Sequence, residues 1–168
     1  MKSVLISIQP KWCELIASGK KTVEVRKTRP KIETPFKCYI YQTKMRWVYS
    51  LLHALGFYSI ARRLARGTGK VIGEFVCDDI FTDKTFGHYG IFKTAACMSD
   101  ADISAYCLNK EIYCWHISNL VIYDKPKELV EFNHCGRNYH FNPPITRPPQ
   151  SWCYVEHPTE KGAIQNDR

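Results

Sequence analysis

The order of elements in the first 19 residues constrains the fold more than any other feature of the chain. Residues 4–8, Val-Leu-Ile-Ser-Ile, are rich in β-branched side chains and predict a first strand. Pro10 then opens a helix, because apolar residues recur at helical spacing over residues 11–18 and Gly19 supplies a C-terminal stop. A strand and a helix therefore follow each other with almost no connecting loop.

A second strand is predicted directly after this helix, from Lys21 to Arg26. The strand period of two places alternate side chains on opposite faces. Residues 22, 24 and 26 share one face, and residues 21, 23 and 25 share the other. Val23 and Val25 are expected to point into the core, with Lys21 at the strand entrance, where its long side chain reaches an opening.

Further strands are predicted over residues 37–43, 69–80, 112–123 and 152–155, the third of them long enough to bend. A short capped helix is predicted at 99–107, and prolines between 126 and 149 favour loops there. We therefore expect an α+β fold, in one domain over residues 1–157 with a flexible C-terminal tail at 158–168.

Residues 45–66 are predicted to form a helical insertion that breaks near Gly56. One side of this helix is apolar and its other positions are rich in Lys and Arg. Such a helix either packs on its own domain with its charges outward or docks on a membrane or an acidic partner. The sequence leaves both alternatives open.

The composition, with 45% hydrophobic and 24% charged residues in 168, is typical of a globular protein. No apolar run is long enough for a transmembrane helix, and the N-terminus has no signal-peptide pattern, so a cytoplasmic location is expected. The eight cysteines are expected to be reduced thiols, because the N-terminus has no signal-peptide pattern and no Cys-x-x-Cys pair is present.

The positive charge is concentrated in the first half of the chain. Residues 1–70 contain 15 Lys and Arg against three acids, whereas residues 71–168 contain 9 against 13. A basic surface of this kind attracts phosphate groups and gains affinity by releasing counterions. The alternative is a basic surface that serves only solubility.

The segment Gly19-Lys20-Lys21-Thr22-Val23-Glu24-Val25-Arg26 resembles the signature of the ASCH family, Gly-x-Lys-x-x-Glu/Thr-x-Arg, in the PUA-like superfamily. The similarity extends to residues 69–75 and 115–126. It implies a small PUA-like (ASCH) β-barrel with flanking helices and an opening at the end of the first helix. It also implies an RNA or nucleotide ligand. Some bacterial members hydrolyse the acetyl amide of N4-acetylcytidine, and others cut RNA.

The residue types in this motif fit a binding cleft. Gly19 allows a positive φ and a close approach of the backbone to a ligand. Lys21 and Arg26 donate hydrogen bonds to phosphate or carbonyl oxygens, and Glu24 between them is kept ionised. The alternative is that Glu24 and Arg26 form only an ion pair at the surface or at the barrel mouth.

Lys21 and Glu24 are also the tentative catalytic residues, because amide hydrolysis needs a base and an oxyanion donor. In the amidohydrolases that the motif resembles, these roles fall to a Lys, a Thr three residues later and a Glu before the second helix. Lys21 matches, but Glu24 occupies the Thr position, and the loop expected over residues 93–99 contains no acid. Thr22 and Glu74 could compensate only through a geometry that the sequence does not give. Binding is therefore predicted ahead of hydrolysis.

Other residues complete the predicted site. Trp152 follows a rigid proline-rich stretch and is the favoured aromatic for stacking on a base. A ribonuclease would draw on bases and phosphate donors among Lys21, Tyr41, Lys44, His116 and Ser151. The predicted binding set is Gly19, Lys20, Lys21, Thr22, Glu24, Arg26, Tyr41, Lys44, Ser151 and Trp152.

Two histidines and two cysteines near the C-terminus raise the alternative of a zinc site. Adjacent His134 and Cys135 suit one tetrahedral site poorly, and no standard ligand spacing links them to His140 and Cys153. Neither a metal nor another cofactor is expected.

Overall fold

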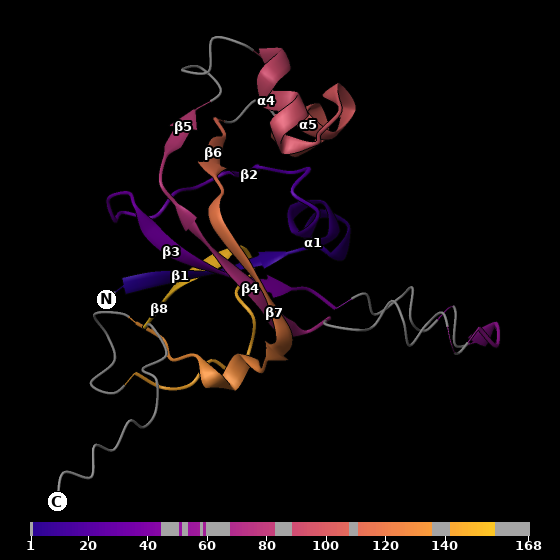
Figure 1. The fold of residues 1–168 in the computed structure, drawn as a ribbon, viewed down its shortest axis with the longest axis vertical. Helices are drawn as coiled ribbons and strands as arrows, with labels where there is room; N and C mark the ends of the chain where they lie inside the picture. The colour runs from indigo at the N-terminus through magenta and orange to yellow at the C-terminus, as the bar shows by residue number, and fades with distance from the viewer. Residues whose placement is uncertain are drawn as a thin grey trace, which may run out of the picture.

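The computed structural model describes residues 2–44, 51, 54–57, 59, 68–82, 89–107, 111–135 and 142–156. The predicted α+β class is confirmed (Figure 1). The elements are β1 (Lys2–Ile8), α1 (Pro10–Ala17), β2 (Val23–Arg26), β3 (Phe36–Gln42), β4 (Lys70–Cys77), β5 (Ile80–Thr82), α4 (Tyr89–Ala96), α5 (Asp100–Cys107), β6 (Tyr113–His116), β7 (Ser118–Lys127), η1 (Leu129–Glu131) and β8 (Trp152–Glu156).

The described strands form two sheets, which are not closed into one barrel. The larger sheet has the order β7-β4-β3-β1-β8 and the smaller one has the order β2-β6-β5. β1 and β3 pair in parallel, with Val4 opposite Cys38, whereas the other strand pairs are antiparallel. A parallel pair needs a crossover, and α1 followed by β2 lies in that connection.

The strand expected at 112–123 is divided into β6 and β7, which belong to different sheets. At the break, Ile117 donates its backbone N–H to the carbonyl of Thr22, 2.9 Å away. Two residues later Asn119 has a φ of +47°, in the left-handed region that Asn tolerates better than most residues. This change of direction carries the chain from the small sheet to the large one.

The central core lies between the larger sheet, α1 and Trp115 of β6. α1 buries Cys13 and Ile16 there, whereas Trp12 and Leu15, two of the apolar residues at helical spacing, are only half-buried. Full burial of a side chain such as that of Ile16 contributes about 1.5–3 kcal/mol. α1 is thereby fixed, and its C-terminal end determines where β2 begins.

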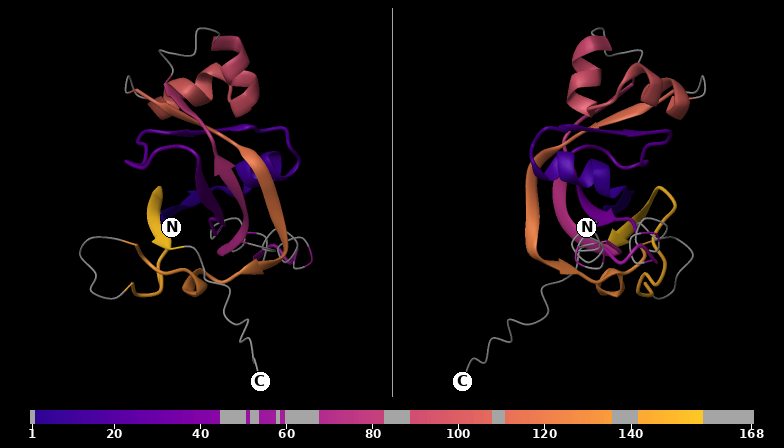
Figure 2. Two further views of the ribbon diagram at one scale, coloured as in Figure 1. Left: turned by 60° about the vertical axis from the view of Figure 1, so that its left-hand side comes forward. Right: turned by 90° about the vertical axis from the view of Figure 1, so that its right-hand side faces the viewer.

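A second core places α4 and α5 on the smaller sheet, at one end of the molecule (Figure 2). Phe92 and Ala96, four residues apart on α4, pack with Val23 and Val25 of β2. The valines therefore point inward as predicted. The loop expected over residues 93–99 is wrong for residues 93–96, which belong to α4. The buried positions of this helix are dictated by its contact with β2.

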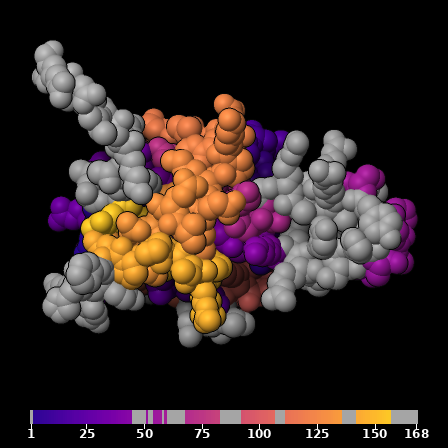
Figure 3. Space-filling model, turned by 90° about the horizontal axis from the view of Figure 1, so that it is seen from below, coloured from indigo at the N-terminus to yellow at the C-terminus, as the bar shows by residue number. Residues whose placement is uncertain are grey.

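The opposite face of the larger sheet is covered by described residues between β7 and β8, and the orange and yellow parts of the chain face the viewer in the view from below (Figure 3). Leu129, Phe132 and Ile145 pack there on Tyr39 and Tyr41. Both tyrosines are consequently core residues rather than free stacking partners.

Most of the predicted helical insertion at 45–66, and the whole predicted tail at 158–168, lie outside the described residues. Within the insertion, the described residues Leu51, Leu55 and Phe57 are exposed. No helix among the described residues combines the length and apolar character needed to cross a membrane.

Candidate functional site

An open cavity of about 810 Å³ lies where the two sheets, α1 and α5 meet. Its walls come from the end of β1, the start of α1, β2 and the loop after it, α5, and the chain just before β8. The cavity volume lies within the range of small-molecule and nucleotide pockets.

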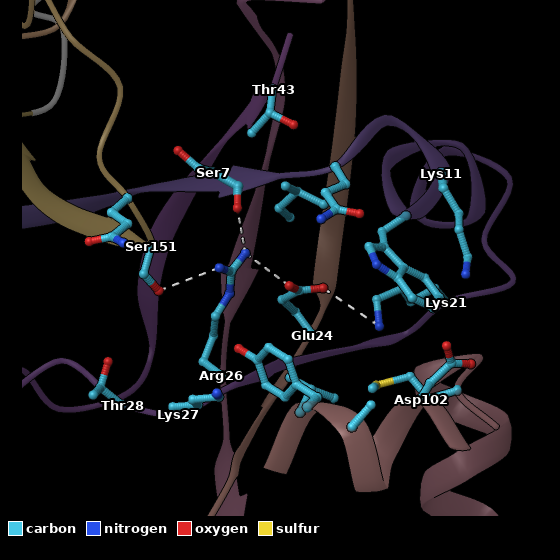
Figure 4. Close-up of a pocket in the computed structure, with 18 residues that line it drawn as sticks. Ser7, Lys11, Lys21, Glu24, Arg26, Lys27, Thr28, Thr43, Asp102 and Ser151 are labelled. Carbon is cyan, nitrogen blue, oxygen red and sulfur yellow. Dashed lines mark hydrogen bonds and ion pairs between the residues drawn. The ribbon is translucent and has the colours of Figure 1, made fainter. Parts of the chain in front are cut away.

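Three charged side chains that belong to the predicted motif form the floor of this cavity (Figure 4). Only 3% of Lys21, 5% of Glu24 and 8% of Arg26 is exposed. Glu24 lies between the two cations, with Oε1 at 2.9 Å from Arg26 Nη2 and Oε2 at 3.6 Å from Lys21 Nζ. The structure therefore brings together the three residues that the motif singled out.

Arg26 is fixed by contacts with three separate parts of the chain. Besides its ion pair with Glu24, its Nη2 donates to the carbonyl of Ser7 at 2.7 Å, and its Nη1 lies 3.4 Å from Ser151 Oγ. Its Nε has no hydrogen-bond partner among the described residues. A planar guanidinium can serve several acceptors at once, which a lysine ammonium could not do with the same geometry.

Lys21 reaches the floor from outside the strand, because β2 begins only at Val23. Gly19, with a φ of +71°, turns the chain after α1, and the backbone N–H of Lys21 then donates to the carbonyl of Leu15. The Lys21 ammonium donates to the carbonyl of Ala96 at 2.7 Å and lies 5.0 Å from the centre of the Trp12 ring. Because Lys21 belongs to this turn and not to β2, the alternation of side chains along the strand does not set its direction.

Burial lowers the pKa of the Lys21 ammonium below its ordinary value, and the negative charge of Glu24 offsets part of this effect. A lysine with a lowered pKa loses its proton more readily than a surface lysine does. The floor therefore contains an amine that is chemically distinct from the exposed lysines of the chain.

The rim of the cavity carries two exposed cations, Lys11 and Lys27. In Figure 4 they lie on opposite sides of the buried cluster. Each stands over an aromatic ring that also lines the cavity: Lys11 Nζ is 4.2 Å from the ring centre of Trp12, and Lys27 Nζ is 4.8 Å from that of Tyr106. Asp102 of α5 brings a negative charge to the same wall.

Asp102 is occupied with the start of α5. Its carboxylate accepts hydrogen bonds from the Ser99 hydroxyl at 2.7 Å and from the Ser99 backbone N–H at 3.0 Å. These bonds lower the pKa of Asp102. Ser99 Oγ in turn accepts from the backbone N–H of Asp102, so this pair caps the helix.

The other predicted binding residues are dispersed. Ser151 lines the cavity, but Gly19, Lys20, Thr22, Lys44 and Trp152 do not, and Tyr41 lies in the core on the far face of the larger sheet. Trp152 packs on Trp115 and donates its indole N–H to Thr28 Oγ1 at 3.0 Å. It therefore supports a cavity residue instead of facing a ligand.

Several lining residues were not predicted, because they lie outside the motif. They include Ser7, Gln9, Lys11, Trp12, Lys27, Thr28, Asp102 and Tyr106. Lys27 directly follows the motif, and Lys11 and Trp12 lie in α1, the helix that directly precedes it. Nothing in the sequence pattern identifies α5 as a wall of the cavity.

His116 and Glu74, which the sequence also raised as possible catalytic residues, do not line the cavity. His116 pairs through Nδ1 with Asp78 at 2.7 Å, and both side chains are about two-fifths exposed. Glu74 is held by Lys37 Nζ at 2.6 Å and by the Tyr123 hydroxyl. Burial alone would raise the pKa of Glu74, but these hydrogen bonds outweigh it and lower the pKa.

The described residues contain no group of three or more His, Cys, Asp and Glu side chains placed to hold a metal ion. His140, one of the four residues considered for zinc, lies outside the described residues. Free thiols are found at cysteines 13, 38, 77, 97, 114, 135 and 153.

The family model of the ASCH domain matches residues 6–127, well over half of the chain. The chain belongs to the ASCH-domain family. The matched range includes the end of β1, α1, β2, the buried cluster, α4, α5 and all of β7. The resemblance inferred from the motif is thereby confirmed.

Solved structures of ASCH from Zymomonas mobilis have the same fold. The first is 20% identical, with a TM-score of 0.60 over 92% of this chain and 87% of that one. A tyrosine-to-phenylalanine mutant of that protein is 19% identical, with a TM-score of 0.60 over 93% and 91%. A serine-to-alanine mutant is 21% identical, with a TM-score of 0.56 over 92% and 88%. No curated protein matches the chain by sequence.

Proposed function

We propose that this ASCH domain binds RNA or a nucleotide-like ligand in the cavity above Lys21, Glu24 and Arg26. The observation that carries the proposal is the placement of three buried charges on the floor of an open cavity. Such an arrangement is costly to bury and often stabilises a fold less than apolar residues would. The presence of this cluster is explained if the fixed charges recognise a polar ligand.

The rim fits the same class of ligand. Lys11 and Lys27 are exposed and outnumber the half-buried acid on the wall, Asp102. Cations at the mouth of a cavity attract phosphates over a distance and hold them by charge-assisted hydrogen bonds. Trp12 and Tyr106 add aromatic surface beside them, which suits a base or a ribose.

Titration of a fluorescent single-stranded RNA by anisotropy at several salt concentrations tests this function. The double variant Lys11→Ala/Lys27→Ala is expected to bind more weakly, and its salt slope to fall by about 0.7 for each phosphate that is no longer neutralised. Lys125→Ala, which removes one exposed cation on β7 that does not line the cavity, is the control for loss of a surface charge elsewhere. Absence of binding at low salt, or equal binding by both variants, would rule out the proposal.

The buried cluster needs separate variants, because these residues also contribute to folding. Lys21→Ala and Arg26→Ala are expected to reduce affinity for RNA and for mononucleotides. Thermal unfolding measured on the same samples identifies any variant that has lost its structure, and only folded variants enter the comparison.

Hydrolysis of an acylated nucleobase is the second candidate, and the lowered pKa of Lys21 beside Glu24 favours it. In such a reaction a base removes a proton from water, the oxygen attacks the acyl carbon, and the C–N bond breaks as the base passes that proton to the departing nitrogen. The products are a carboxylate and the free amine. Glu24 in place of the threonine of the similar amidohydrolases weighs against that chemistry.

Release of acetate from N4-acetylcytidine, lost in Lys21→Ala, would establish the amidohydrolase. Shortening of a labelled RNA during the binding experiment would instead identify a ribonuclease. Binding without either product is the outcome that we expect.

A further inference from the structure

The loop that leaves the cavity after β2 carries three cations within five residues. Its sequence is Lys27-Thr28-Arg29-Pro30-Lys31, and Lys27, Arg29 and Lys31 are exposed. We call these three residues the basic strip. Lys27 and Thr28 line the cavity, whereas Arg29 and Lys31 lie beyond its lining. The strip therefore begins at the cavity mouth and continues onto the surface.

Contacts with β8 hold this loop in place. Thr28 Oγ1 accepts a hydrogen bond from Trp152 Nε1 at 3.0 Å, and the backbone N–H of Lys31 donates to the hydroxyl of Tyr154 at 2.7 Å. The loop is thus attached near both ends of the strip. Cations on an anchored loop lose little further freedom when they bind a ligand.

Tyrosine rings alternate with cations along this surface. Lys27 Nζ lies 4.8 Å from the ring centre of Tyr106, and Arg29 Cζ lies 5.9 Å from that of Tyr113. Lys2 Nζ lies 5.0 Å from the ring centre of Tyr154, to which the loop is attached. Proteins that bind single-stranded nucleic acid combine a cationic track for the backbone with aromatic rings on which bases stack.

We propose that the basic strip binds the sugar–phosphate backbone of a single-stranded RNA, one nucleotide of which enters the cavity. This inference rests on the proposed function. From Lys27 to Lys31 the chain spans at most about 15 Å, enough to accompany a few nucleotides but not a long duplex. A single strand fits better than a duplex because its bases can leave the stack and enter a cavity.

Binding of oligouridylates of one, two, four and eight nucleotides to the full chain tests the strip. For the wild type, affinity is expected to rise about 10-fold or more between one and eight nucleotides, as phosphates beyond the cavity reach the strip. Arg29→Gln/Lys31→Gln keeps the side chains long and polar but removes two charges. It is expected to lose most of this gain, and its salt slope to fall by about 1.4.

Lys125→Gln is the control for loss of a surface charge elsewhere and should show the wild-type gain with length, since Lys125 is exposed on β7. The inference is overturned if affinity does not rise with length, if the double variant keeps the full gain, or if an eight-base-pair duplex binds as tightly as the single strand. In those cases binding of the mononucleotide in the cavity still supports the proposed function. If neither RNA nor a mononucleotide binds, the proposed function fails as well.

Discussion

Arg26 and Glu24, two positions apart on β2, point the same way and meet at 2.9 Å on the floor of the cavity. The sequence left open whether this pair lies at the surface, where an ion pair contributes little. Both side chains are instead nine-tenths or more buried, and Lys21 shares the same carboxylate. The burial of each charge in the cluster is therefore compensated by its ion pairs with the others.

Replacing Glu24 by Gln should destabilise the fold by about 3 kcal/mol, because it leaves Arg26 and Lys21 buried without a compensating negative charge. Gln nearly preserves the shape of the side chain, so the loss reports charge rather than volume. Urea unfolding followed by circular dichroism gives the change in the free energy of unfolding.

Glu33→Gln is the control for this experiment, since Glu33 is exposed in the loop before β3. Its effect should stay within about 0.5 kcal/mol. A loss from Glu24→Gln that is no larger than the control would show that the buried cluster does not depend on its carboxylate.

The contribution of Lys21 to stability should increase as the pH rises. Burial lowers the pKa of Lys21 in the folded protein below its ordinary value of 10.5, so the unfolded chain binds this proton more tightly. Protonation therefore favours unfolding. The resulting loss in the free energy of unfolding is fully present below the lowered pKa of Lys21 and disappears as the pH rises from there to 10.5.

Comparing the wild type with Lys21→Met isolates this effect from other groups that titrate at alkaline pH. The free energy of unfolding of the wild type minus that of the variant should become more positive between neutral pH and pH 10.5. A difference that is constant, or that falls with pH, would contradict the lowered pKa.

Gly73→Ala should destabilise the protein by about 2 kcal/mol, because β4 and β7 approach closely at this position. A Cβ atom on Gly73 would lie 2.4 Å from the carbonyl oxygen of Val121 and 3.2 Å from Ile122 Cα, so backbone must move. Gly19→Asn is the control, because Cβ at Gly19 meets nothing within 4 Å and Asn tolerates its positive φ. Equal melting temperatures for the two variants would contradict this account.

Much of the fold could be predicted because its signals are local. The β-branched run of β1, Pro10 at the start of α1 and the alternation of β2 each depend on neighbours in sequence. α4 could not be predicted in this way. Its buried Phe92 and Ala96 are explained only by the face of β2 against which they pack.

The same distinction applies to the candidate site. Lys21, Glu24 and Arg26 lie within six residues and could be found as one motif. Asp102 and Tyr106 come from a helix about 80 residues away, and only the packing of α5 against the smaller sheet brings them to the cavity. Tyr41 shows the opposite case. Its strand was predicted correctly, but its side chain points into the core and not into the cavity.

The hydrogen bond between Trp152 and Thr28 should be measurable as a coupling between two positions far apart in sequence. The indole N–H of Trp152 donates to Thr28 Oγ1 at 3.0 Å and attaches the loop after β2 to β8. Thr28→Val and Trp152→Phe each remove this bond, the second with some loss of packing on Trp115. Urea unfolding of both single variants and the double variant should give a coupling of about 1 kcal/mol. Strictly additive losses would mean that the bond does not hold the loop.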